Sequence, residues 1–197
     1  MKSQITFVTG GTKSGKSAFA EGLLSRDAPI CYIATGVMIS QDPEMQLRIK
    51  THQQRRSQLW QTEERYKDFS SFVLTHQYAG YLLDDAIMGV TNLFYELIKR
   101  DSKKKSQSID NFIDRITKEY LESIKKIIIN EWRKLFKAIS TCHCRLVIVS
   151  DEVGLGIVPA TKQSRILRDI YGEVNQLIAQ AADDAYFVIS GLPQRIK

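Results

Sequence analysis

Along the chain, short apolar runs alternate with longer segments in which apolar residues recur every three or four positions. The short runs are typical of buried strands, which we expect at residues 4–9, 30–34, 81–84, 146–150 and 185–190. The longer segments predict helices near residues 17–25, 43–56, 88–99, 109–140 and 162–182. Strands that alternate with helices form βαβ units, so the pattern predicts a mostly parallel sheet with helices on both faces. Ligands of such sheets bind beyond the carboxyl ends of the strands, and we expect the functional residues there.

Two stretches refine this pattern. In the longest predicted helix, apolar residues at helical spacing predict one buried stripe, formed by Ile113, Ile116, Tyr120, Ile124 and Ile127. Residues 99–108 are polar and charged and include no large apolar side chain, so we expect a mobile surface loop there. We find no internal repeat and no second domain, and therefore expect residues 1–197 to form one domain with a polar insert at about 100–110.

Composition adds broad limits. Of the 197 residues, 43% are hydrophobic and 25% are charged, as in ordinary globular proteins. The net charge of +6 is compatible with nucleotides, with nucleic acid and with simple solubility. No apolar run approaches the roughly 20 residues of a membrane span, and none has the length of a secretory signal, so we expect a cytoplasmic protein. Cys142 and Cys144 flank a histidine, but no second ligand pair has the spacing of a zinc site.

The most specific motif lies between the first predicted strand and the first predicted helix. It matches G-x-x-x-x-G-K-[ST] in full, with Gly10, Gly11, Thr12, Lys13, Ser14, Gly15, Lys16 and Ser17. Its glycines let backbone N–H groups point at phosphate oxygens, and the following helix adds the positive end of its dipole. In such a loop Lys16 contacts the β- and γ-phosphates and the Ser17 hydroxyl binds Mg²⁺. The motif predicts a nucleoside triphosphate site in a P-loop NTPase-like (RecA-like) α/β fold, but it does not specify the reaction.

A second acidic ligand for the metal is expected at the end of another strand. Asp84 and Asp85 end one predicted strand, and Asp151 and Glu152 follow another. Acidic residues at strand ends also commonly cap the next helix. The residues alone therefore leave the choice between the two pairs open.

A histidine lies among arginines in the helix predicted after Asp42-Pro43-Glu44. Arg48, His52 and either Arg55 or Arg56 fall on one face of that helix. Positive neighbours favour a neutral, nucleophilic imidazole, and arginines can hold the phosphates of a triphosphate. Such a face could attack an α-phosphorus and form a covalent histidine–nucleotide intermediate. On these residues alone, a solvated basic helix is the simpler interpretation.

Several motifs together resemble one enzyme family. They occur in the order FVTGGTKSGKSAFAE, YIATG, DPEMQLRIKTHQQRR, VTNLF, DEVGLGIVP, RDIYGEVNQLIAQAAD and VISGLPQRIK. This order resembles the bifunctional adenosylcobinamide kinase/adenosylcobinamide-phosphate guanylyltransferase family over nearly the whole chain, apart from the lysine-rich insert. DEVGLGIVP and the histidine helix are the more specific matches, because many families share the phosphate loop.

The resemblance implies two reactions and a set of site residues. The family phosphorylates the aminopropanol hydroxyl of adenosylcobinamide, then transfers GMP from GTP to that phosphate and releases pyrophosphate. The family motif R-I-x-x-H maps onto the segment from Arg48 to His52, which implies that His52 carries GMP. The family's strand-end acid maps onto Asp84, where relatives have glutamate, and implies a nucleotide and metal ligand beside Ser17. Glu64 is implied as a contact of the guanine or the ribose.

The resemblance also implies the partners. They are a corrinoid and a nucleotide, GTP or ATP with Mg²⁺, without nucleic acid or membrane, and the assembly is a homotrimer. Residues 1–197 then form a single P-loop nucleotide-binding transferase domain. One alternative is a monofunctional P-loop kinase that forms no covalent nucleotide. Another is a nucleic-acid-stimulated NTPase that uses the basic charge and the lysines at 103–105.

Overall fold

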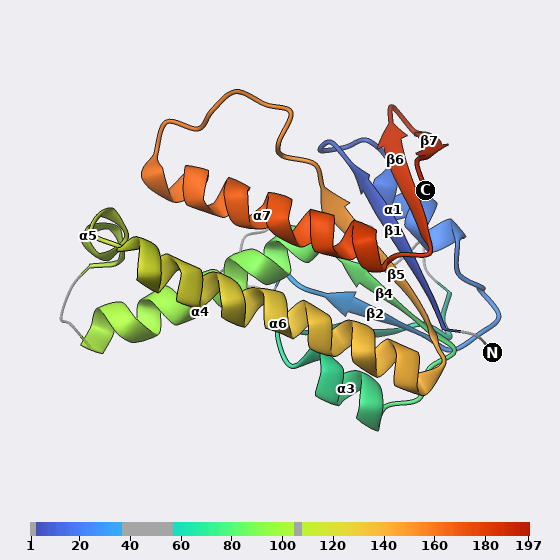
Figure 1. Cartoon of the computed structure of the whole chain (residues 1–197). Helices are drawn as coiled ribbons and strands as arrows, with labels where there is room; N and C mark the ends of the chain where they lie inside the picture. The colour runs from blue at the N-terminus through green and yellow to red at the C-terminus, as the bar shows by residue number, and fades with distance from the viewer. Residues whose placement is uncertain (1–2, 37–56, 105–107) are drawn as a thin grey trace.

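A seven-stranded sheet forms the centre of the molecule (Figure 1). The computed structural model describes residues 3–36, 57–104 and 108–197, in which the strands lie in the order β3-β2-β4-β5-β1-β6-β7. Their bounds are Gln4–Gly10 for β1, Ile30–Ala34 for β2, Gln61–Glu64 for β3, Gly80–Asp84 for β4, Arg145–Asp151 for β5, Asp184–Ile189 for β6 and Leu192–Arg195 for β7. Every neighbouring pair is parallel except β6 and β7. The carboxyl ends of β1 to β6 therefore lie at one edge of the sheet.

The helices that the structure describes are divided unequally between the two faces of the sheet (Figure 1). Helix α1 (Lys16–Gly22) packs on one face, against β1, β4 and β5. The other face carries α3 (Phe69–Thr75), α4 (Ala86–Lys104), α6 (Lys118–Cys142) and α7 (Lys162–Ala181), with the short α5 (Ile109–Asp114) against α4 and α7. The predicted α/β fold class is confirmed, with a mostly parallel sheet between helices. No helix in the described part of the chain has the length and apolar character needed to cross a membrane.

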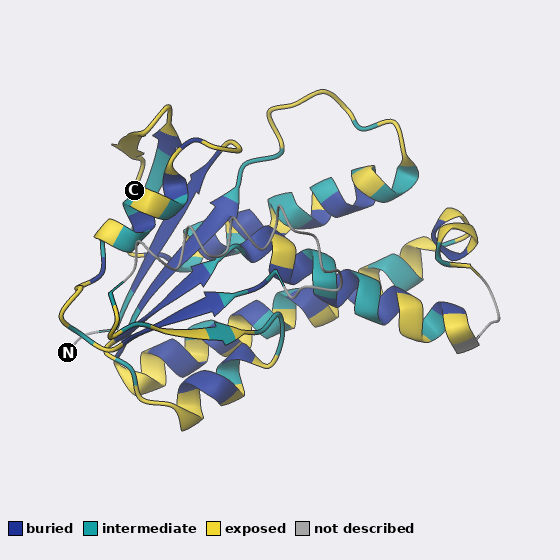
Figure 2. Ribbon diagram, turned by 180° about the vertical axis from the view of Figure 1, so that it is seen from behind, coloured by how far each residue is buried: buried dark blue, intermediate teal, exposed yellow. Residues whose placement is uncertain are grey.

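Alternate residues of the strands build two apolar cores, one on each side of the sheet. Figure 2 shows the central strands as mostly buried. In β1, Phe7 faces the larger core under α4, α6 and α7, while Val8 faces the smaller core under α1. In β5, Ile148 and Val147 divide in the same way. Because both faces are covered, the central strands are apolar on both sides, and their runs were therefore predictable.

The long helix predicted at 109–140 is two helices, so that prediction is wrong. Thr117 begins α6 as its N-cap, where Thr117 Oγ1 accepts a hydrogen bond from Tyr120 N at 3.3 Å. The stripe of α6 that packs into the core consists of Ile124, Ile128, Trp132, Leu135 and Ile139. Ile127, predicted on the stripe, is 45% exposed. Thr117 starts a new helix and so interrupts the predicted one. In α6 the next core residue after Ile124 is Ile128, four positions on, so Ile127 lies outside the buried face.

The polar stretch predicted as a mobile loop is helical from residue 99 to 104, where it forms the end of α4, so the loop prediction is wrong there. Its polar side chains have partners: Asp101 accepts hydrogen bonds from Arg100 and, at 2.8 Å, from the Tyr120 hydroxyl of α6. Ser102 is buried. Contacts with α6 thus stabilise a helix end that has no apolar pattern of its own. Residues 105–107, and the helix predicted at 43–56, lie outside the described residues.

Candidate nucleotide site

The glycine-rich segment connects β1 to α1 at the carboxyl edge of the sheet. Ser14 N donates to Gly11 O at 3.1 Å and closes a turn, and Gly15 has a φ of 95°, in the left-handed region that favours glycine. A Cβ at Gly10 would lie 2.4 Å from Val188 O, so only glycine fits between β1 and β6 at this level. Strand, turn and helix therefore stand in the arrangement that lets a loop bind phosphate.

The turn between β6 and β7 supports this loop from the side. Gly191, in that turn, donates its N–H to Ser14 O at 2.7 Å. The backbones of the two segments lie so close at Gly15 and Gly191 that a Cβ on Gly15 would be 3.2 Å from Gly191 Cα. This contact was missed in the sequence, since β7 was not expected.

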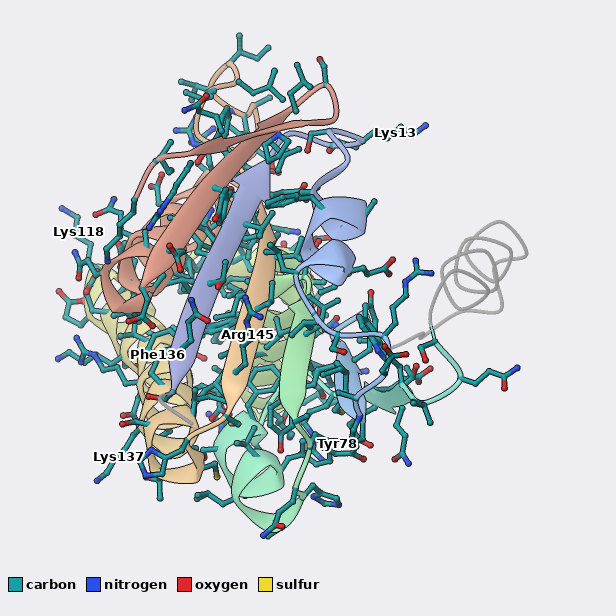
Figure 3. All side chains as sticks on the ribbon, turned by 90° about the vertical axis from the view of Figure 1, so that its right-hand side faces the viewer. Lys13, Tyr78, Lys118, Phe136, Lys137 and Arg145 are labelled. Atoms are coloured by element: carbon teal, nitrogen blue, oxygen red, sulfur yellow. The ribbon has the colours of Figure 1, made fainter. Side chains whose placement is uncertain are left out.

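The two lysines of the loop have different surroundings. Lys13 is exposed, and Figure 3 shows its side chain pointing away from the molecule. Lys16 begins α1 and is only 9% exposed. Its Nζ donates to Gly11 O at 3.3 Å and forms an ion pair with Asp151 Oδ1. Lys16 therefore lies within the loop, where a phosphate group would bind.

Strand order and register explain why Asp151 reaches Lys16. β5 is the direct neighbour of β1, and Gly10 pairs with Asp151 at the end of both strands. β4 lies one strand further away, and its Leu83 pairs with Ile148, so β5 extends about two residues, or ~7 Å, beyond Asp84. Glu152, the next residue, accepts a hydrogen bond from Gly154 N at 2.6 Å and anchors the following loop.

Asp84 and Asp85 at the end of β4 have separate partners. The Tyr32 hydroxyl of β2 donates to Asp84 Oδ2 at 3.0 Å. Asp85 Oδ1 accepts from Met88 N at 2.7 Å, as a cap at the start of α4. Burial raises the pKa of the Asp85 carboxyl to about 6, an effect that the Met88 hydrogen bond opposes. The charges of Asp84 and Asp151 also raise the pKa of Asp85, and the charge of Lys16 lowers it.

The oxygen donors at this edge fit Mg²⁺. The Ser17 hydroxyl lies in the first turn of α1, and the Asp84 and Asp151 carboxylates end the nearby strands. Asp151 Oδ1 is buried and has no hydrogen-bond donor among the described residues beyond its ion pair with Lys16. No group of three or more His, Cys, Asp or Glu in those residues could hold a metal by itself. A Mg²⁺ ion here would share its coordination with phosphate oxygens and water, as this ion usually does.

Some of the predicted site residues are not brought to the loop. Glu64 is exposed at the end of β3, and four strand spacings separate β3 from β1, which is about 19 Å. Glu64 is thus too far away to contact phosphates bound by the loop. Arg48, His52, Arg55 and Arg56 lie outside the described residues.

Polar side chains of α4 and α7, missed in the sequence, fix the strand ends that carry the site. Asn92 Nδ2 of α4 donates to Thr35 O at 2.7 Å, just beyond β2. Asn175 Nδ2 of α7 donates to Asp151 O at 3.0 Å, and Asn175 is 9% exposed. A buried asparagine in an amphipathic helix was the available signal, because a buried amide needs hydrogen-bond partners.

Comparisons with known proteins identify the family that this chain resembles. The family model described as cobinamide kinase / cobinamide phosphate guanyltransferase matches residues 6–196. The bifunctional adenosylcobalamin biosynthesis protein CobU of Escherichia coli K12 is 34% identical over 192 residues, which cover 96% of this chain and 98% of that protein. The protein of the same name from Salmonella typhimurium is 34% identical over 196 residues, with the same coverage. Among solved structures, a KaiC-like protein of Pyrococcus horikoshii has a TM-score of 0.44 and 11% identity, and the match covers 94% of this chain and 71% of that chain.

Proposed function

The chain belongs to the cobinamide kinase / cobinamide phosphate guanyltransferase family, and on this premise we propose which of its residues perform the two reactions. It is a bifunctional enzyme of cobalamin biosynthesis, acting as a kinase on cobinamide and as a guanylyltransferase on cobinamide phosphate. A family match over nearly the whole chain favours this function over a monofunctional kinase and over a nucleic-acid-stimulated NTPase.

For the kinase reaction, we assign the triphosphate to the loop from Gly10 to Ser17. The observation that supports this assignment is the position of Lys16, whose side chain is buried and donates to Gly11 O within the loop. The loop also begins at Gly10, where there is no room for a Cβ. Lys16 stabilises the charge that spreads over the γ-phosphate oxygens as the corrinoid hydroxyl attacks in line. Ser17 and Asp84 would hold Mg²⁺, and the bound ion would supply positive charge that offsets the same developing charge.

For the guanylyl transfer, we assign His52 as the nucleophile. A neutral imidazole nitrogen attacks the α-phosphorus of GTP, a P–N bond forms, and the P–O bond to pyrophosphate breaks. The phosphate of cobinamide phosphate then displaces the histidine and takes up GMP. Arg48 and Arg55 or Arg56 hold the phosphates of GTP. The support is the match of Arg48-Ile49-Lys50-Thr51-His52 to the family motif.

The assignment of His52 is tested by incubating the protein with α-labelled GTP and Mg²⁺. We expect the label on the protein, and a mass increase of one GMP on the peptide that contains His52. The variant His52→Asn should lose the label and keep the kinase reaction. Full labelling of His52→Asn would contradict the assignment.

His143→Asn is a matched control for this experiment. His143 is exposed at the end of α6 with a φ of 51°, a conformation that asparagine tolerates. This variant removes a histidine without a backbone penalty and should label like the wild type. Loss of label in both variants would indicate a general defect and not a role of His52.

We also propose that this one loop binds the nucleotide of both reactions, which is GTP or ATP for the kinase reaction and GTP for the guanylyl transfer. Glu64 contacts the nucleoside, and the enzyme acts in the cytoplasm as a homotrimer. The proposal of a trimer rests on family resemblance. Sedimentation equilibrium measures it directly, and a monomer at micromolar concentration would contradict it.

A further inference from the structure

The ion pair between Lys16 and Asp151 already occupies the lysine expected to bind phosphate. The Lys16 side chain is 11% exposed and that of Asp151 is 26% exposed, so water screens the pair only in part. Lys16 also donates to Gly11 O within its own loop. In this state the ammonium is therefore held in the loop by a carboxylate and a carbonyl.

The position of Asp151 does not depend on Lys16. Asn175 Nδ2 donates to Asp151 O, and the buried Ser150 Oγ donates to Asn175 Oδ1 at 2.6 Å. On the other side, Glu152 N donates to Gly10 O at 3.0 Å, which ties the end of β5 to the start of the phosphate loop. These contacts fix the backbone of Asp151, so its carboxylate stays beside the loop when Lys16 changes its partner.

The two carboxylates at the end of β4 have their own hydrogen-bond donors. Tyr32 donates to Asp84, and Met88 N donates to Asp85. The buried Oδ1 of Asp151 has Lys16 as its ionic partner and no hydrogen-bond donor in the described part of the chain. Asp151 is thus the carboxylate whose charge becomes uncompensated when Lys16 turns to a phosphate.

On the premise that this loop binds the triphosphate of the proposed function, we infer that Asp151 is a positioning residue for Lys16 and makes triphosphate binding depend on Mg²⁺. Without a metal, a triphosphate that takes over Lys16 leaves the Asp151 carboxylate facing phosphate oxygens of the same sign. A divalent cation held by phosphate oxygens beside this carboxylate offsets the repulsion. Asp151 therefore weakens the binding of metal-free nucleotide much more than the binding of the Mg²⁺ complex.

The test is to measure the dissociation constant of GTP by calorimetry, once in EDTA and once in excess Mg²⁺, with His52→Asn present in every protein compared so that no guanylyl-histidine forms. In EDTA, we expect Asp151→Asn to bind GTP about tenfold more tightly than the wild type, because one nearby negative charge is gone. In Mg²⁺, the two proteins should differ by no more than about twofold. The ratio of the two constants, which reports the coupling to Mg²⁺, should therefore fall about tenfold. A purely structural role of Asp151 would change both constants together and leave this ratio unchanged.

Three further variants make the result specific. Asp151→Ser removes the same charge with a smaller side chain and should reproduce the loss of coupling, whereas Asp151→Glu keeps the charge and should retain it. Asp27→Asn removes an exposed carboxylate outside the phosphate loop and should bind like the wild type. An unchanged ratio in Asp151→Asn and Asp151→Ser, or weaker binding of metal-free GTP, overturns the inference. If the wild type binds no GTP in either buffer, the assignment of the loop as the nucleotide site fails as well, and the two failures are distinguishable.

Discussion

Replacing Asp85 by asparagine should stabilise the protein at neutral pH and leave its stability in acid almost unchanged. Asp85 lies between the end of β4 and the start of α4, where burial raises the pKa of its carboxyl from 3.8 to about 6. The charges of Asp84 and Asp151 act in the same direction, whereas the Met88 hydrogen bond and the charge of Lys16 act against it. At neutral pH the folded protein therefore carries a charge that its surroundings disfavour.

The magnitude follows from the proton that the folded chain retains. A carboxyl with a higher pKa in the folded chain than in the unfolded chain stabilises the fold in its protonated form. The free energy of unfolding then falls as the pH rises from 3.8 to about 6, and it is level above that window. The whole difference is about 3 kcal/mol. Asparagine is uncharged and its Oδ1 can still accept the hydrogen bond from Met88 N, so Asp85→Asn removes the destabilisation.

Urea unfolding in EDTA, from about pH 4 to about pH 8, measures the effect. We expect Asp85→Asn to exceed the wild type by only about 0.5 kcal/mol near pH 4, and by about 1–3 kcal/mol above about pH 6. The control Asp27→Asn should differ from the wild type by less than about 0.5 kcal/mol throughout. A gap that is the same at every pH, or a loss of stability at neutral pH, would refute the reasoning.

Two further substitutions test the loop and the end of α4. Gly10→Ala places a Cβ 2.4 Å from Val188 O, so thermal unfolding should show a loss of about 1–3 kcal/mol. Gly22→Ala should lose none, because no atom of the described residues lies within 4 Å of its Cβ, and equal effects would contradict the tight fit at Gly10. Tyr120→Phe removes the hydrogen bond to Asp101, so unfolding should cost about 1 kcal/mol less and amide exchange should accelerate at residues 99–104. Unchanged exchange there would mean that α6 does not hold the polar end of α4.

The interior of the sheet was predictable because its strands are buried on both faces. β2 has the predicted bounds, Ile30–Ala34, and β1, β4, β5 and β6 overlap their predicted runs. Such strands are continuous apolar runs, and the glycines and polar residues between them mark the turns. Parallel pairing followed from the intervening helices, because parallel strands need a crossover connection, which is usually a helix.

The edges of the sheet were not predictable in this way. β3 has the polar sequence QTEE, and its regular structure comes from backbone pairing with β2. β7 contains a proline, a residue that argues against a strand in a sequence, and within the described residues it pairs with β6 alone. Neither segment carries an apolar alternation, because neither contributes to the core. Their pairing depends on neighbours that the local sequence does not reveal.

The phosphate loop was predictable because its motif is a short local sequence. Its glycines are required by the backbone, through the close approach at Gly10 and the positive φ at Gly15. The partner of Lys16 was not, because two strands end in acidic residues and the sequence ranks neither. Strand order decides between them: β5, and not β4, lies beside β1. Asp151 therefore contacts Lys16, while Asp84 pairs with Tyr32 one strand further away.

The two edge strands affect how copies of this protein meet at high concentration. An exposed strand edge can pair with the edge of another molecule and extend the sheet from copy to copy, as in fibrils. β3 carries two adjacent glutamates, Glu63 and Glu64, and β7 has only four residues, one of them Pro193, which has no N–H to donate. Like charges and a missing donor disfavour such growth. Association between copies is therefore expected to use side-chain surfaces and not a sheet continued across molecules.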